Sequence, residues 1–275
     1  VEFGDVCDIR KCISCNIGCA GNRIGINRPI RCTVNPNVPD GEEYKKYKIT
    51  KPCNVVVIGG GTAGMEAACT AAEVGCNTFL LEEKETLGGL AAEISKIPAK
   101  KRLADFPHYL EHRAAGLDNL YIFTGTQATP ENIRKFHPNI IVSSTGSAPL
   151  LPPIAGLKDR IDNENHNIYS ILGMISHIND FPKDLKGKKV VVVGGGAVGL
   201  DVVEFFADRN ADISIVEMMD QIGRDLDPVS KNDTKTMMKK HNVHQLTKTA
   251  LLEVKDSSFL VRGEGEPYEL PFEYG

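Results

Sequence analysis

The residues with the clearest capacity for chemistry are the eight cysteines, which all lie before residue 77 in a chain of 275 residues. Four of them, Cys12, Cys15, Cys19 and Cys32, have the spacing Cys-x2-Cys-x3-Cys-x12-Cys. Disulfides that stabilise a small secreted fold are spread along it, so this clustering indicates a metal site instead. Four thiolates can bind structural zinc or an iron-sulfur cluster, and three close cysteines with one distant cysteine favour [4Fe-4S] over zinc.

The other four cysteines fall outside this spacing, and we interpret Cys7, Cys53, Cys69 and Cys76 as ordinary surface or packing residues. The sequence contains no Gly-x-Ser-x-Gly, His-Glu-x-x-His or phosphate-loop lysine motif. No pair of carboxylates and no Cys-His pair stands out as an acid-base or nucleophilic site. We therefore predict no catalytic residue for an organic substrate within this chain.

A glycine turn of the type that binds a dinucleotide follows the apolar run that starts at residue 54. In Gly59-x-Gly61-x-x-Gly64 the first glycine permits a tight turn, the second lets a diphosphate approach the backbone, and the third lets helix and strand pack closely. The diphosphate would lie on the unpaired amides of the helix N-terminus. Glu82 ends the next predicted strand, where its carboxylate can accept hydrogen bonds from a ribose diol.

The whole pattern occurs a second time, displaced by 135 residues without a gap. Its turn is formed by Gly194, Gly196 and Gly199, and its acidic residue is Glu217. A single glycine fingerprint is a weak signal, but strand, turn, helix, strand and terminal acid all recur together here. The duplication predicts two dinucleotide-binding units.

Two such units in one chain suit an enzyme that holds FAD and a nicotinamide dinucleotide with their rings stacked for hydride transfer. The carboxylate of Glu217 would repel the 2′-phosphate of NADPH, and Met218 and Met219 supply no compensating cation. We therefore expect NADH rather than NADPH. Arg224 opposes this expectation, because it lies close enough along the chain to reach a phosphate.

The strands and helices expected around these residues indicate an α/β fold, in which a Cys-rich segment is followed by two Rossmann-like three-layer domains. We also expect a helix over 103–117, a helix over 234–246 and a hairpin that starts at residue 250. The predicted organisation is a Cys-rich iron-sulfur segment at 1–50, an FAD-binding domain at 51–150, a connecting segment at 151–185 and an NAD(H)-binding domain at 186–275.

Composition narrows the class of protein further. The chain has 41% apolar and 25% charged residues and a net charge of −4, the balance of a globular protein. No apolar stretch approaches the length of a membrane span, and no basic run suits nucleic acid. No export signal opens the sequence, so we expect a cytoplasmic location with neither a membrane nor a nucleic acid as partner.

Taken together, these motifs resemble the iron-sulfur flavoenzymes of the old yellow enzyme class, which include 2,4-dienoyl-CoA reductase, enoate reductase and trimethylamine dehydrogenase. DIRKCISCNIGC followed by CTVNP is similar to the family's cluster loop, with the four spaced cysteines at the ligand positions. Gly88 and Gly89 fall where the family's loop passes close to FAD. Thr145 and Gly146 match its Ala-Thr-Gly turn, with Ser144 in place of the alanine.

The resemblance implies that NADH reduces FAD, and that [4Fe-4S] relays single electrons to FMN in an N-terminal barrel absent from this sequence. An activated carbon-carbon double bond would be reduced at that barrel, so the organic substrate would bind outside this chain. The sequence then corresponds to the C-terminal redox portion of such an enzyme, with its second Rossmann-like domain truncated. Two alternatives remain: a non-catalytic electron-transfer or adaptor subunit, and a flavoenzyme of the disulfide-reductase type.

Overall fold

A computed structural model describes residues 6–38 and 47–275. These residues form two compact units, and each is described by itself. The first contains residues 6–19, 29–38 and 47–148, and the second contains residues 20–28 and 149–275.

A parallel four-stranded sheet organises the first unit, with the strand order β3-β2-β1-β4. Its apolar central strands are hydrogen-bonded in register, with Val55 opposite Thr78 on one side and Ile140 on the other. Such buried, β-branched strands are typical of parallel sheets covered by helices. The strands are β1 (Asn54–Ile58), β2 (Asn77–Leu81), β3 (Leu120–Phe123) and β4 (Ile140–Ser143).

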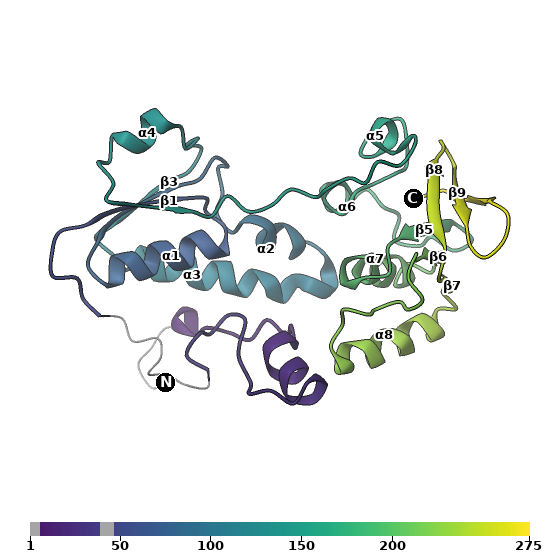
Figure 1. Cartoon of the computed structure of the whole chain (residues 1–275), viewed down its shortest axis with the longest axis horizontal. Helices are drawn as coiled ribbons and strands as arrows, with labels where there is room; N and C mark the ends of the chain where they lie inside the picture. The colour runs from purple at the N-terminus through teal and green to yellow at the C-terminus, as the bar shows by residue number, and fades with distance from the viewer. Residues whose placement is uncertain (1–5, 39–46) are drawn as a thin grey trace. The chain divides into compact units, whose positions relative to one another are not determined.

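Two helices cover one face of this sheet, α1 (Thr62–Glu73) and α3 (Asp105–Ala115), and they pack against each other. Figure 1 shows them together below the strands. Met65 and Leu110 are fully buried with Leu80 in the core that they share. The shorter elements of this unit are α2 (Gly89–Ile94), the 3₁₀-helix η3 (Pro98–Ala104) and α4 (Pro130–Arg134).

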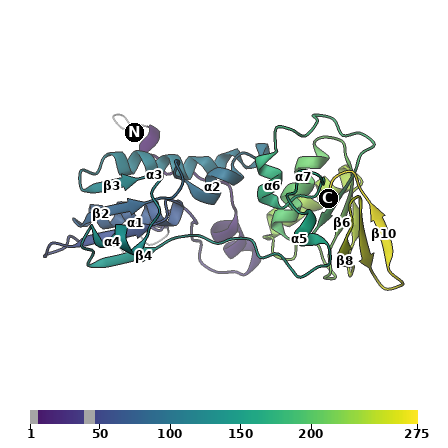
Figure 2. The ribbon, with the colours of Figure 1, turned by 90° about the horizontal axis from the view of Figure 1, so that it is seen from above.

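The second unit contains a parallel sheet of order β5-β6-β7 and an antiparallel sheet of order β10-β9-β8. Figure 2 shows the antiparallel strands at the yellow end of the colour scale. Val191 and Val216 from the parallel sheet share a core with Phe259 and Phe272. The strands are β5 (Lys189–Val193), β6 (Asp212–Val216), β7 (His244–Leu246), β8 (Ala250–Val254), β9 (Ser258–Arg262) and β10 (Tyr268–Pro271).

Helices α5 (Leu157–Arg160) and α6 (Ile171–Ser176) precede β5, and α7 (Ala197–Ala207) connects β5 to β6. Leu157 is buried in the core of the second unit, so part of the predicted connecting segment packs within this unit. Helix α8 (Pro228–Lys240) links β6 to β7.

The α/β fold class predicted from the sequence is confirmed. The duplication holds residue for residue, because β1, the start of α1 and β2 recur as β5, the start of α7 and β6 at the same offset of 135. The hairpin expected from residue 250 is formed by β8 and β9.

The expected bounds of α8 were wrong. This helix starts at Pro228, because Asp227 caps it by accepting hydrogen bonds from the amides of Val229 and Ser230, and it ends before His244, which belongs to β7. A proline at the first helical position, directly after an aspartate cap, is a strong start signal that apolar periodicity alone misses.

The cysteine-bearing segment has little regular structure. It contains the 3₁₀-helix η1 (Val6–Asp8) and a π-helix, η2 (Ile17–Gly25). Across residues 6–38 and 47–275, none of the helices has the length and apolarity needed to cross a membrane.

The core below the first sheet yields a stability prediction. Leu110→Ala removes a side chain with no solvent exposure and should lower the free energy of unfolding by about 3 kcal/mol, through lost burial and a residual cavity. Leu90→Ala, at a leucine that is 51% exposed, should change it by less than about 0.5 kcal/mol. Urea unfolding followed by circular dichroism measures both, and equal effects would contradict the assigned core.

Candidate functional site

The first glycine turn has no room for a side chain at Gly59 or Gly64. A Cβ atom on Gly64 would lie 1.8 Å from the carbonyl oxygen of Gly59, and one on Gly59 would lie 2.3 Å from that of Ser144. Gly59 also has a φ of +101°, which other residues rarely adopt. The glycines therefore let β1, the turn and α1 pack with backbone against backbone.

Glu82 fastens this turn to the end of β2. One carboxylate oxygen accepts a hydrogen bond of 2.5 Å from the amide of Gly60, and the other accepts one of 2.8 Å from Lys84. The residue is only 8% exposed. A carboxylate held by two amides can still accept further hydrogen bonds, so Glu82 can serve both the turn and a ribose.

The loop that carries Gly88 and Gly89 packs directly on the glycine turn. The amide of Gly88 donates a 2.9 Å hydrogen bond to the carbonyl of Gly60. A Cβ atom on Gly89 would lie 2.9 Å from the Cα of Gly61. After β4, Thr145 follows Ser144 beside Gly59, and Gly146 has a φ of +75° with open space around it. The structure thus brings together these residues at the carboxyl end of one sheet.

The second unit repeats this geometry. A Cβ atom on Gly199 would lie 1.9 Å from the carbonyl oxygen of Gly194. Glu217 accepts hydrogen bonds of 2.7 Å from the amides of both Gly195 and Met219. The duplicated residues are therefore equivalent in hydrogen bonding as well as in sequence.

The repeat extends to a loop that sequence reasoning missed. The amide of Gly223 donates a 2.7 Å hydrogen bond to Gly195, as Gly88 does to Gly60. Extending the offset of 135 past Glu217 would have revealed this match. It also places Arg224 and Asp225 where the first unit has Gly89 and Leu90, so the two turns differ in charge at this loop.

Two cavities adjoin the second glycine turn. One of about 330 Å³, named the polar cavity for the side chains of Glu217, Gln221 and Arg224 in its lining, lies beside Gly195 and Gly196. An apolar one of about 480 Å³ is lined by the valines of β5 and by residues of α6. Gly196 and Asp225 line both cavities. A polar and an apolar cavity joined at a glycine turn suit a ligand with a sugar-phosphate portion and a ring.

The four spaced cysteines lie in the first unit, and none of them forms a disulfide. Their two stretches are joined by the backbone, since the amide of Arg31 donates a 2.7 Å hydrogen bond to the carbonyl of Gly18. The Cys12 sulfur also accepts a hydrogen bond from the amide of Ser14. This donor set suits an iron-sulfur cluster, because thiolates and N–H···S bonds are what such clusters use.

Across residues 6–38 and 47–275, however, no group of three or more His, Cys, Asp or Glu side chains is gathered to hold a metal ion. The cluster assignment to Cys12, Cys15, Cys19 and Cys32 therefore stays a prediction.

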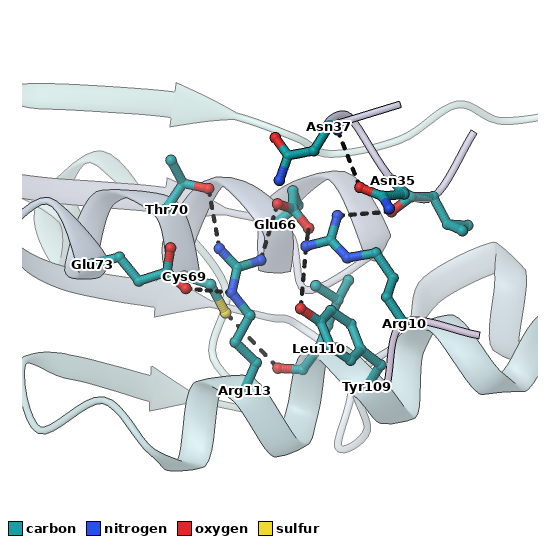
Figure 3. Close-up of polar contacts among 11 residues, drawn as sticks. Arg10, Asn35, Asn37, Glu66, Cys69, Thr70, Glu73, Tyr109, Leu110 and Arg113 are labelled. Carbon is teal, nitrogen blue, oxygen red and sulfur yellow. Dashed lines mark hydrogen bonds and ion pairs between the residues drawn. The ribbon is translucent and has the colours of Figure 1, made fainter. Parts of the chain in front are cut away.

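Arg10 closes the base of the segment that carries these cysteines. Its guanidinium donates a 2.7 Å hydrogen bond to the carbonyl of Val34, so residues on either side of the four cysteines are tied together. The same group donates to the hydroxyl of Tyr109, lies over its ring at 4.8 Å, and forms an ion pair with Glu66 (Figure 3). Arg10 thereby attaches the segment to α1 and α3.

Arg113 completes this network on the other side of Glu66, donating hydrogen bonds to Glu66 at 2.9 Å and Glu73 at 2.5 Å (Figure 3). Burial disfavours charge on Arg113, but the hydrogen bonds that it donates to the carboxylates of Glu73 and Glu66, together with their negative charges, outweigh burial and raise its pKa. The guanidinium therefore stays charged and holds α3 against α1, the helix that begins at the glycine turn.

Comparison with known proteins finds a family model that matches most of the chain. Residues 53–271 match the family model of the pyridine nucleotide-disulphide oxidoreductases, and residues 30–105 match it a second time. The chain is 36% identical over 252 residues to the NADH oxidase of Thermoanaerobacter brockii, covering 90% of this chain and 37% of the relative. It is 30% identical over 277 residues to the bilirubin reductase of Mediterraneibacter gnavus, covering 100% of this chain and 41% of the relative.

A solved structure of 2-naphthoyl-CoA reductase with 2-naphthoyl-CoA matches with a TM-score of 0.82 and 25% identity, covering 98% of this chain and 39% of that protein. The chain therefore spans about two fifths of the length of these relatives.

Because each glycine turn lacks room for a Cβ atom, a substitution in one turn should affect the ligand of that unit alone. Gly64→Ala and Gly199→Ala each force a Cβ atom onto a backbone carbonyl, so the turn must open. The first should lower FAD binding by at least about tenfold, and the second should do the same to NADH binding, which corresponds to about 1.4 kcal/mol or more. Bound flavin and NADH affinity measure the two effects.

Gly116→Ala and Gly265→Ala are the controls, because an added Cβ meets only ordinary contact in the first and open space in the second. Both should leave ligand binding unchanged. Loss of both ligands from either turn variant, with the fold intact, would contradict the assignment of separate sites.

Proposed function

Since the chain belongs to the pyridine nucleotide-disulphide oxidoreductase family, we propose that it is the nucleotide-binding part of an NAD(P)H-dependent flavoprotein oxidoreductase. The first unit binds FAD and the second binds the nicotinamide dinucleotide. The activity of the whole protein belongs to the same proposal, because its relatives are more than twice as long.

One observation carries this proposal: both glycine turns are fastened by the carboxylate at the end of the neighbouring strand. Glu82 holds Gly60, and Glu217 holds Gly195, by equivalent hydrogen bonds. A turn fixed in this way keeps the first amides of the following helix directed at the diphosphate site. Because the arrangement occurs once in each unit, it supports two dinucleotides per chain.

FAD supplies the hydride-accepting ring when it is bound. In the first unit, the first-turn amides of α1 bind its diphosphate, and Glu82 binds the ribose of its adenosine. Gly146 has open space around it after β4, where the flavin could lie, and the close packing of Gly88 and Gly89 on the glycine turn would fix the loop at this edge of the sheet. In the second unit the amides of α7 and Glu217 do the same for the nicotinamide dinucleotide.

The preferred dinucleotide is NADH. The carboxylate of Glu217 lines the polar cavity and would repel a 2′-phosphate bound there. Two unit charges 4 Å apart repel each other by about 4 kcal/mol at an effective dielectric constant of 20, before screening by salt. Arg224 lines the same cavity and offsets part of this repulsion, which makes the preference a matter of degree.

Cys12, Cys15, Cys19 and Cys32 would hold a [4Fe-4S] cluster, which supplies one-electron transfer when it is present. Three observations support this: the spacing of the four cysteines, the absence of a disulfide at any of them, and the hydrogen bond from Arg10 to Val34 that joins the two ends of their segment. The direct contact of this segment with α1 and α3 adds support, because it attaches the four cysteines to the unit that we propose to bind FAD.

The remainder of the protein would contain the FMN barrel at which an organic substrate is reduced. The resemblance to enoate and 2,4-dienoyl-CoA reductases supports an activated carbon-carbon double bond as the group reduced. The similar 2-naphthoyl-CoA reductase, solved with its aroyl-CoA thioester, supports a CoA thioester as one possible class of substrate.

A disulfide reductase is the second candidate, since the matched family is named for that chemistry. Its redox pair would need two cysteines beside the flavin. Cys69 is fully buried in α1 with its sulfur directed at the carbonyl of Leu110, and Cys76 precedes β2 at the other end of the sheet from the glycine turn. Their placement favours packing over redox chemistry.

Anaerobic addition of NADH to the flavin-loaded protein tests the proposal directly. We expect bleaching of the flavin absorbance by about one equivalent of NADH, because hydride transfer needs the two nucleotides in one protein. Flavin that stays oxidised while NADH binds would favour the non-catalytic electron-transfer or adaptor alternative.

The dinucleotide preference yields its own prediction. Glu217→Gln keeps an acceptor oxygen for the turn and removes the charge, so kcat/KM for NADPH relative to NADH should rise about three- to tenfold. Initial rates with an artificial electron acceptor measure this ratio. Glu82→Gln, the same replacement in the first unit, should leave the ratio unchanged. A wild-type preference for NADPH would contradict the expectation.

The closure of the cysteine segment can be tested through metal content. Arg10→Ala should lower iron and acid-labile sulfide per chain by at least about fivefold, because residues that orient metal ligands affect affinity strongly. Flavin content should stay constant. Arg102→Ala, which removes a single exposed hydrogen bond to Ser14, is the matched control and should have a smaller effect. Zinc without sulfide in the wild-type protein would contradict the cluster.

A further inference from the structure

The loop after β6 carries a carboxylate at the place where the two glycine turns differ most. Asp225 Oδ2 accepts a 3.2 Å hydrogen bond from the amide of Ala197, the first residue of α7. The same oxygen would be 3.4 Å from a Cβ atom on Gly196. In the first unit the corresponding residue is Leu90, whose side chain cannot accept a hydrogen bond and is 51% exposed.

The amide of Ala197 is one that a diphosphate would also need. The first amides of a helix have no partner within the helix, and they are satisfied either by a side chain or by an anion. Asp225 already supplies a negative charge there, and the helix dipole favours it as it would favour a phosphate. A carboxylate and a phosphate at the same amide repel each other, so one must leave when the other binds.

We infer that Asp225 is an internal substitute for the diphosphate of the nicotinamide dinucleotide, and that binding of the dinucleotide displaces its carboxylate from α7. This inference rests on the proposed function, which places NADH at the second glycine turn. The displacement exchanges one hydrogen bond for another at Ala197, so part of the binding energy of the diphosphate is spent on removing Asp225.

The loop can release the carboxylate without unfolding. Ile222 and Gly223 are buried, and Gly223 is fixed to Gly195 by a 2.7 Å hydrogen bond. Asp225 itself is exposed, so its side chain can turn into solvent while the base of the loop stays in place. Gly223 and Ile222 therefore keep the loop on the glycine turn while the side chain of Asp225 moves.

The difference between Asp225 and Leu90 matches the different demands on the two sites. FAD is a resident cofactor and must be retained, whereas NADH is a substrate and must leave after each reaction. A competing carboxylate weakens binding and speeds release, so it suits the second site and would be harmful at the first. Asp225 therefore lowers the affinity of the second glycine turn for its dinucleotide, as an exchangeable ligand requires.

The test uses flavin-loaded protein and compares two ligands, NAD⁺, which has a diphosphate, and adenosine, which has none. Asp225→Asn keeps an acceptor oxygen near Ala197 but removes the charge. It should lower the Kd of NAD⁺ about three- to tenfold and leave the Kd of adenosine unchanged, as measured by calorimetry. Asp220→Asn is the matched control, since Asp220 is an exposed residue of the same loop that does not line the polar cavity.

An unchanged or higher Kd of NAD⁺ in Asp225→Asn would overturn the inference. Equal tightening of adenosine, or the same tightening in Asp220→Asn, would also overturn it, because the effect would not act through the diphosphate at α7. The proposed function fails separately: NAD⁺ would then bind to none of the proteins, or bind equally well to Gly199→Ala.

Discussion

The geometry of both nucleotide units depends on one interaction, the hydrogen bonds between a strand-terminal carboxylate and the amides of a glycine turn. Glu82 and Glu217 each bind an amide within the turn and another in their own loop. The bonds fix the end of one strand against the start of a helix that follows the neighbouring strand. A second loop, at Gly88 or Gly223, then packs on the turn. The helix N-terminus is thereby held at the carboxyl edge of the sheet, where parallel α/β folds bind ligands.

Much of this arrangement could be predicted from the sequence, because glycines at a fixed spacing and an acid at a fixed distance leave few alternatives. A Cβ atom on Gly64 or Gly199 would overlap a backbone carbonyl, so only glycine fits at these positions of the spacing. Alternation of apolar runs with glycine turns predicted the strands and helices for the same reason. The start of α8 was missed, since a single aspartate cap before Pro228 determines it.

Other features depend on contacts between residues far apart in the chain, and no local pattern encodes them. Arg10 binds Val34, Glu66 and Tyr109 from three different segments, and its role is visible only in three dimensions. The capping of α7 by Asp225 is of the same kind. The network around Glu66 links the cysteine-bearing segment to α1, the helix that starts at the first glycine turn.

The central claim is that one chain binds two different dinucleotides at two equivalent turns. Equilibrium dialysis of the protein with FAD and NAD⁺ together measures this most directly, through the amount of each ligand bound per chain. The account predicts one FAD and one NAD⁺, with neither displacing the other. Competition between the two ligands for a single site, or binding of only one dinucleotide per chain, would contradict it.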